Sequence, residues 1–173
     1  MRWSMDREQF YAVMKTLKAE SIQDLEALAV TIADFPHGQD AFLERAWIIN
    51  AIDCGSYETV QWMISKNVEL SFRDEEGLTP FHSCLYSISP DKYEILSLLI
   101  ESGGNINIRG MNDYTPLHLA AVLNDEKAMD ILLKAGADQT IKTRIDSYAT
   151  PEQEAKIMGR NKAAHYLANY GKT

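Results

Sequence analysis

The feature that most constrains this chain is an internal repeat. Residues 114–121 read Tyr-Thr-Pro-Leu-His-Leu-Ala-Ala, and an apolar helical segment follows at 128–138. Upstream, residues 79–82 read Thr-Pro-Phe-His and repeat the start of this motif. Units of this kind cannot bury their apolar faces alone, so neighbouring units stack into one continuous core. The repeat therefore predicts a stacked array of helix pairs.

The helix-breaking glycine of each unit measures the length of the repeat. Gly136 lies 21 residues after Thr115, whereas Gly103 lies 24 residues after Thr79. The second unit therefore carries three extra residues, which we place in the segment 87–91, between its two helices. Because loops tolerate insertions, this segment either extends a contact surface or has no role.

The same spacing recovers a unit on either side of these two. Counting back 33 residues from Thr79 reaches Ala46, and Asn67 then takes the glycine position. Asn is the residue other than glycine that best tolerates left-handed backbone angles. Counting forward 35 residues from Thr115 reaches Thr150, where Glu-Gln-Glu at 152–154 replaces buried positions. We expect these polar residues to face water in a terminal capping unit.

These motifs resemble the ankyrin repeat, whose pattern runs Gly-x-Thr-Pro-Leu-His-x-Ala-Ala and then Leu-Leu and Gly-Ala. The resemblance implies an all-α solenoid of helix-turn-helix units with short hairpin loops. We predict one domain, with repeats at about 41–73, 74–109 and 110–142 and a C-terminal capping unit at 143–171. Residues 6–18 and 21–34 predict two amphipathic helices. They form either a degenerate first repeat or an N-terminal helical cap over residues 1–40, and we favour the cap.

The residues that look most like catalytic groups are better explained by structure. His82 and His118 occupy the motif's histidine position, where the resemblance implies a hydrogen bond to turn backbone. Cys84 follows His82 by two residues, and such neighbours do not face each other on a helix. Asp74 and the glutamates that follow it lie on a hairpin without a nucleophile or pocket. We predict no catalytic, cofactor-binding or metal-binding residue, and therefore no enzyme.

Charge and composition narrow the class of partner. The formal net charge is −8, and the 17 lysines and arginines form no clustered stripe. Nucleic acid is an unfavourable ligand for such a chain, whereas a basic protein would be attracted to it. Two cysteines give no disulfide framework, and no leader or membrane-spanning run is recognisable. We expect an acidic, cytoplasmic protein that is a monomer by itself and needs no cofactor or membrane.

The resemblance implies that a partner binds the concave side, which hairpin tips and the exposed side of each first helix form. Several positions carried over by register hold apolar, aromatic or arginine side chains, which are typical of interface centres. Alternatively, some of these side chains pack between neighbouring hairpins. The predicted partner-binding residues are Arg73, Glu75, Glu76, Leu78, Tyr86, Arg109, Met111, Asn112, Tyr114 and Leu123.

Two functions fit this surface. The first is an inhibitor or immunity-type protein that neutralises a basic toxin or enzyme. The second is a scaffold or adaptor subunit of a larger assembly, for which charge matters less and the tyrosines matter more. A thiol hydrolase that uses Cys54 or Cys84 is a third hypothesis, but it would need a general base and an oxyanion site that the sequence does not indicate.

Overall fold

The computed structural model describes residues 7–19, 21–54, 56–145 and 147–172. Within these ranges the chain forms ten α-helices and one short 3-10 helix, and its only ladder pairing is an isolated bridge between Gln39 and Ala46. The predicted all-α class is confirmed. The α-helices are α1 (Arg7–Lys18), α2 (Ile22–Thr31), α3 (Trp47–Cys54), α4 (Tyr57–Ser65), α5 (Pro80–Tyr86), α6 (Lys92–Glu101), α7 (Pro116–Val122), α8 (Glu126–Lys134), α9 (Pro151–Ile157) and α10 (Asn161–Asn169), and the 3-10 helix η1 spans Met111–Asp113.

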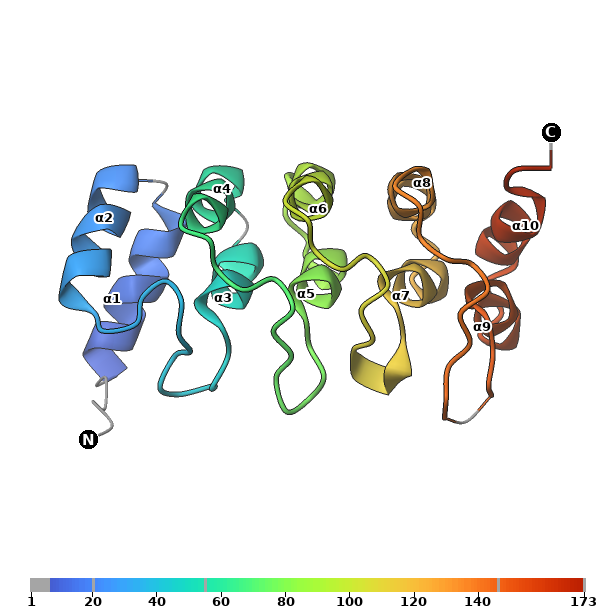
Figure 1. The fold of residues 1–173 in the computed structure, drawn as a ribbon, viewed down its shortest axis with the longest axis horizontal. Coiled ribbons are helices and arrows are strands. Elements are labelled where there is room, and N and C mark those ends of the chain that lie inside the picture. The colour runs from blue at the N-terminus through green and yellow to red at the C-terminus, as the bar shows by residue number, and fades with distance from the viewer. Residues whose placement is uncertain (1–6, 20, 55, 146, 173) are drawn as a thin grey trace.

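The helices stack as successive pairs in two layers (Figure 1). An inner layer contains α1, α3, α5, α7 and α9, and an outer layer contains α2, α4, α6, α8 and α10. From α3 onward, a hairpin loop precedes each inner helix and projects away from the outer layer (Figure 1). The array is therefore the stacked solenoid that the repeat predicts.

The inner helices begin where the Thr-Pro motif stands. The side chains of Thr79, Thr115 and Thr150 each accept a hydrogen bond from the backbone N–H three residues later. Proline follows each threonine at the start of the helix, where its missing N–H costs nothing and its fixed φ suits the first turn. Local chemistry therefore sets the start of α5, α7 and α9.

Left-handed residues end the outer helices at the predicted positions. Gly103 after α6 and Gly136 after α8 have φ values of +83° and +92°. Asn67, which takes the glycine position after α4, has a φ of +60°. The prediction that asparagine replaces glycine there is confirmed, because its short polar side chain tolerates this conformation.

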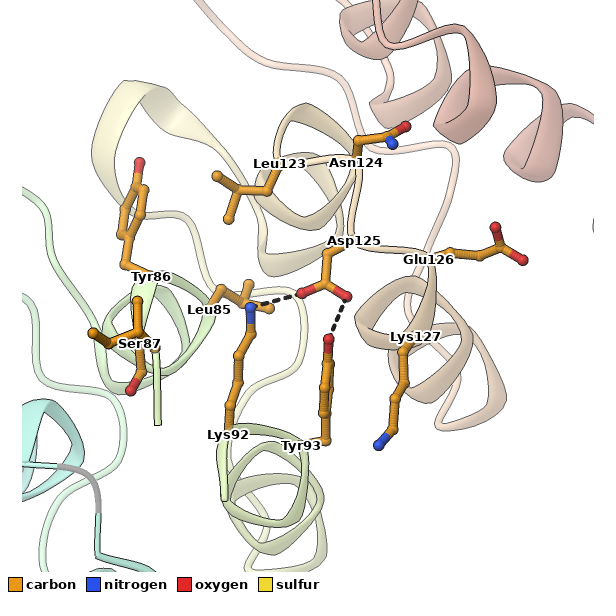
Figure 2. A pocket seen from close by; sticks show the side chains of 11 residues that line it. Leu85, Tyr86, Ser87, Lys92, Tyr93, Leu123, Asn124, Asp125, Glu126 and Lys127 are labelled. Atoms are coloured by element: carbon orange, nitrogen blue, oxygen red, sulfur yellow. Dashed lines mark hydrogen bonds and ion pairs between the residues drawn. The ribbon is translucent and has the colours of Figure 1, made fainter. Parts of the chain in front are cut away.

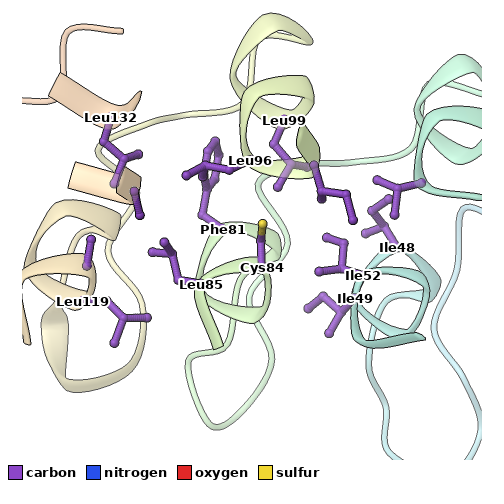
Figure 3. Packing of buried hydrophobic residues seen from close by; sticks show 14 of the residues in the cluster. Ile48, Ile49, Ile52, Phe81, Cys84, Leu85, Leu96, Leu99, Leu119 and Leu132 are labelled. Atoms are coloured by element: carbon purple, nitrogen blue, oxygen red, sulfur yellow. The ribbon is translucent and has the colours of Figure 1, made fainter. Parts of the chain in front are cut away.

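The core lies between the two layers and between neighbouring pairs (Figure 3). Ile48, Phe81 and Leu132 come from three successive units, and all are buried. Cys84 points into the same core (Figure 3). Ala120 is also completely buried, and its small side chain lets neighbouring helices approach closely.

The N-terminal pair closes one end of this core. Its helices agree with the predicted ranges, except that α2 ends at Thr31 because Ile32 is extended, with φ −107°. Residue 6, where the first predicted helix begins, lies outside the described residues. Phe35 packs against both Trp47 and Trp62, with ring centroids 5.4 Å and 5.9 Å away. The Trp62 indole also donates a hydrogen bond of 2.8 Å to Glu26 of α2.

The C-terminal pair differs from the prediction at one residue. Gln153 is exposed as expected, but Glu154 is only 6% exposed. Its carboxylate accepts hydrogen bonds from the hydroxyls of Tyr114, at 2.7 Å, and Ser147, at 2.6 Å. The expectation that all three polar residues face water was therefore wrong for Glu154, because two hydroxyl donors satisfy its charge in a buried position.

Candidate functional site

The second hairpin presents two acidic residues at its tip. Glu75 and Glu76 are exposed, and the turn behind them is closed by Asp74, whose side chain accepts a 2.6 Å hydrogen bond from the Leu78 amide. Gly77 has a φ of +85°, a conformation that glycine adopts without strain. Leu78 is half-buried and packs against the core. Of these predicted residues, the glutamates are available to a partner and Leu78 is largely a packing residue; the predicted Arg73 is exposed beside them.

The third hairpin is held to the fourth by a buried carboxylate. Asp113 contacts Arg109 and Arg144, each at 2.6 Å. Hydrogen bonds from Arg144 lower the pKa of Asp113, although burial works in the opposite direction. Arg109 also donates a 2.8 Å hydrogen bond to the carbonyl of Lys142. The predicted binding residue Arg109 therefore fixes the relative position of two hairpins.

The tip of this hairpin carries the predicted Met111 and Asn112. Asn112 is exposed and has a left-handed φ of +57°, and Met111 is half-buried. The first and fourth hairpins carry exposed apolar residues that are not among the predicted binding residues. They are Phe42, Leu43, Ile145 and Tyr148. Extending the repeat register to these two hairpins would have found them.

Tyr114 is engaged inside the chain on three sides. Its ring stacks on His118, with centroids 5.7 Å apart and an interplanar angle of 4°. Its hydroxyl binds Glu154, and its carbonyl accepts a 3.0 Å hydrogen bond from Nε2 of His82. The side chain is half-buried, so it presents only part of its surface to a partner. Sequence register placed Tyr114 correctly on the hairpin but gave no sign of the long-range bond to Glu154.

Tyr86 and Leu123 lie on opposite sides of a groove at the edge of the array. This edge groove has a volume of about 550 Å³ and runs between the α5–α6 and α7–α8 connections (Figure 2). Tyr86 and Leu123 are 46% and 40% exposed. Ile88, from the predicted insertion at 87–91, also lines the groove and is fully exposed. The insertion therefore adds apolar surface next to two of the predicted residues.

An ion-paired network forms one wall of the edge groove. Asp125 Oδ2 lies 2.7 Å from Nζ of Lys92, and Oδ1 accepts a 3.2 Å hydrogen bond from the Tyr93 hydroxyl (Figure 2). Burial favours a raised pKa for Asp125, but the contacts with Lys92, the Ala128 amide and Tyr93 lower it overall. Burial and Asp125 raise the pKa of Tyr93. The network holds the two helix connections in a fixed relation.

His82, His118 and Cys84 take structural positions, as predicted. Nε2 of His82 and of His118 donate to the carbonyls of Tyr114 and Ala149, each at 3.0 Å. Burial lowers the pKa of His82 to about 4 and also lowers that of His118. Burial raises the pKa of the Cys84 thiol to about 12, so this thiol stays protonated and a poor nucleophile. Burial also raises the pKa of Cys54.

Within the described ranges, no three His, Cys, Asp or Glu side chains gather in a way that could hold a metal ion. None of the helices in the described part of the chain is long and apolar enough to cross a membrane.

The helix-pair array, its threonine caps and its buried histidines define a repeat protein, and sequence comparison gives the family. A model of ankyrin repeats, in three copies, matches residues 48–143, which is more than half of the chain. The chain belongs to the ankyrin-repeat family. Proteins of this family typically bind other proteins and are typically not enzymes.

Curated proteins from several organisms share this region. An ankyrin repeat-containing protein of Schizosaccharomyces pombe is 33% identical over 96 residues, or 56% of this chain and 43% of that protein. A probable serine/threonine-protein kinase of Dictyostelium discoideum is 34% identical over 74 residues, or 43% of this chain and 9% of the kinase. The mouse RelA-associated inhibitor is 31% identical over 90 residues, or 52% of this chain and 11% of that protein. The chain therefore spans less than half the length of each of these relatives.

Proposed function

We propose that this chain is a non-enzymatic interaction module that binds a basic protein partner through its inner face, the predicted concave side that the hairpin tips and the exposed sides of the inner helices form. The observation that carries the proposal is a row of exposed apolar side chains at equivalent ends of three successive inner helices. They are Tyr86 on α5, Leu123 after α7, and Ile157 and Met158 at the end of α9, and each is at least 40% exposed.

Repeated exposure at the same end of successive inner helices supports a contact surface. A single exposed apolar residue is ordinary, whereas a row of them is typical of interface centres, which tyrosine and methionine enrich. Acidic tips such as Glu75 and Glu76 lie on the hairpins of the same array, and the formal net charge of −8 would steer a basic partner towards the chain. Binding of this kind suits a cytoplasmic inhibitor or immunity-type protein, monomeric by itself, that neutralises a basic toxin or enzyme.

Affinity capture with matched variants tests this proposal. The tagged chain is incubated with native lysate at low and high salt, and Tyr86→Ala with Leu123→Ala is compared with Tyr11→Ala with Val30→Ala. Tyr11 and Val30 are 64% and 87% exposed on the N-terminal pair, so the control removes apolar surface elsewhere. We expect that the unmodified chain and the control variant capture a basic protein at low salt. The variant with Tyr86→Ala and Leu123→Ala should not capture it.

Two outcomes would reject the proposal: no basic protein captured at low salt, or equal capture by both variants. The activity of the captured partner then separates the two functions. Loss of that activity in the complex supports an inhibitor. Unchanged activity, together with recovery of further subunits, supports the alternative of a scaffold or adaptor.

A further inference from the structure

A second groove lies on the outer layer. This outer groove has a volume of about 510 Å³ and is lined by parts of α4, α6 and α8. Tyr57, Tyr93, Leu98 and Ile131 form its apolar lining, and all four are half-buried side chains that pack against the core. Their remaining surface is open to an occupant without any rearrangement of the core.

The rim of the outer groove carries carboxylates that form no ion pair with any described residue. Glu58, Glu94 and Glu101 line the groove, are exposed, and have no ion-pair partner among the described residues. Elsewhere on the surface, a lysine four residues along the helix contacts Asp130 or Glu152, at 2.7 Å and 2.5 Å. Helix α6 has no basic residue in its last turn and offers no such pairing.

The position of Glu101 on α6 is itself unfavourable for a negative charge. Glu94, Leu98 and Glu101 are spaced four and three residues apart and therefore share one face of α6. Glu101 is the last residue of the helix, where unsatisfied carbonyls and the helix dipole disfavour a negative charge. A charge in an unfavourable position that no internal partner offsets is expected where the surface binds another molecule.

The groove already accommodates one cation of its own. Nζ of Lys127 lies 4.1 Å from the ring centroid of Tyr93, the distance of a cation–π contact. Among the described residues that line the groove, Lys127 is the one basic residue. Tyr93 and Lys127 also line the edge groove, so these two residues form the border between the two grooves.

We propose that the outer groove binds a basic, amphipathic segment of a protein partner. Lysine or arginine side chains of the segment contact Glu58, Glu94 and Glu101, and an apolar side chain packs against Leu98 and Ile131. The apolar lining and the acidic rim together favour a basic, amphipathic segment. A nucleic acid or an anionic membrane would be repelled by the acidic rim. This contact is separate from the inner face, and neither depends on the other.

A synthetic peptide provides the test. The probe is a fluorescein-labelled peptide of lysine, leucine and serine, and its binding to the full chain is measured by fluorescence anisotropy. The variant Glu94→Gln with Glu101→Gln is compared with Glu75→Gln with Glu76→Gln, which removes the same charge from a hairpin tip. All four glutamates are exposed and make no ion pair with the described part of the chain, so both variants should fold.

The expected result is a loss of affinity confined to the groove variant. Two surface charge contacts should weaken binding about five- to tenfold, against less than about twofold for the hairpin control. A matched peptide with serine in place of leucine should bind more weakly to the unmodified chain. Amide chemical shifts of Leu98 and Ile131 should move on titration, while those of Tyr86 and Leu123 should not.

Several results would overturn the proposal. Equal losses in the two variants would show only general attraction to an acidic surface, and equal binding of the serine peptide would remove the apolar contact. Self-association of the unmodified chain that the groove variant abolishes, seen by sedimentation velocity, would make a second copy the occupant. Because these variants leave Tyr86 and Leu123 intact, failure here is distinguishable from failure of the inner-face proposal.

Discussion

Acidification should destabilise this protein through His82. The ring is 1% exposed and accepts a hydrogen bond at Nδ1 from the Thr79 hydroxyl, at 2.7 Å. Its Nε2 donates to the Tyr114 carbonyl. A carbonyl can only accept, so the folded state holds a neutral ring with its proton on Nε2. Protonation at Nδ1 would place an unpaired charge in the core.

The magnitude follows from the shift in pKa. Burial lowers the pKa of His82 to about 4, whereas an unfolded histidine titrates near pH 6.5. Between these values the unfolded state binds a proton that the folded state does not, so stability falls as the pH falls. Above about pH 6.5, His82 costs the protein almost no stability. The free energy of unfolding falls by about 2 kcal/mol by about pH 5 and by about 3 kcal/mol near pH 4.

Urea denaturation across this pH range measures the effect. His82→Gln removes the titrating ring, so its free energy of unfolding should be lower at neutral pH but should change less between about pH 6.5 and 4. His165→Gln is the control, because His165 is exposed and outside the core. The reasoning would be refuted if His82→Gln kept the same pH slope as the unmodified chain.

Three further perturbations have definite expected outcomes. A Cβ added at Gly110 would collide with Cε1 of His82, so Gly110→Ala should lower the free energy of unfolding by about 1–3 kcal/mol in urea titrations; no loss would contradict the packing. Glu101→Gln should raise that free energy by up to about 0.5 kcal/mol, because a charge leaves the wrong end of α6, and a decrease in melting temperature would count against this. Cys84 should resist iodoacetamide until the chain unfolds, because it is buried and its pKa is raised to about 12; rapid labelling of the native protein, located by mass spectrometry, would disprove it.

The sequence carries the helix starts and ends because local chemistry decides them. A threonine before a proline marks a capped helix wherever it stands, and Thr79, Thr115 and Thr150 all behave alike. Asn67 and Gly136 likewise end helices through their own backbone preferences. A fixed spacing then places the next unit, so the array follows from a few local signals repeated along the chain.

The candidate surface was harder to predict because its contacts are made between units. Tyr114 meets Glu154 forty residues downstream, and Arg109 and Arg144 meet around Asp113. Register places such residues on the same hairpins but does not show which of them bind one another. The acidic rim of the outer groove could not be predicted for a related reason. The repeat pattern describes one helix at a time, whereas the groove is lined by three helices from three units.

The aromatic cluster at the N-terminal end determines what fluorescence can report. Trp47 and Trp62, the two tryptophans in the described part of the chain, both contact Phe35, and none lies beyond α4. In a stacked array, each unit interacts only with its neighbours and the ends can open separately. Emission from these two indoles therefore monitors the first units, while circular dichroism averages over every helix. Unfolding that starts at α9 and α10 would lower the helical signal before the emission changes.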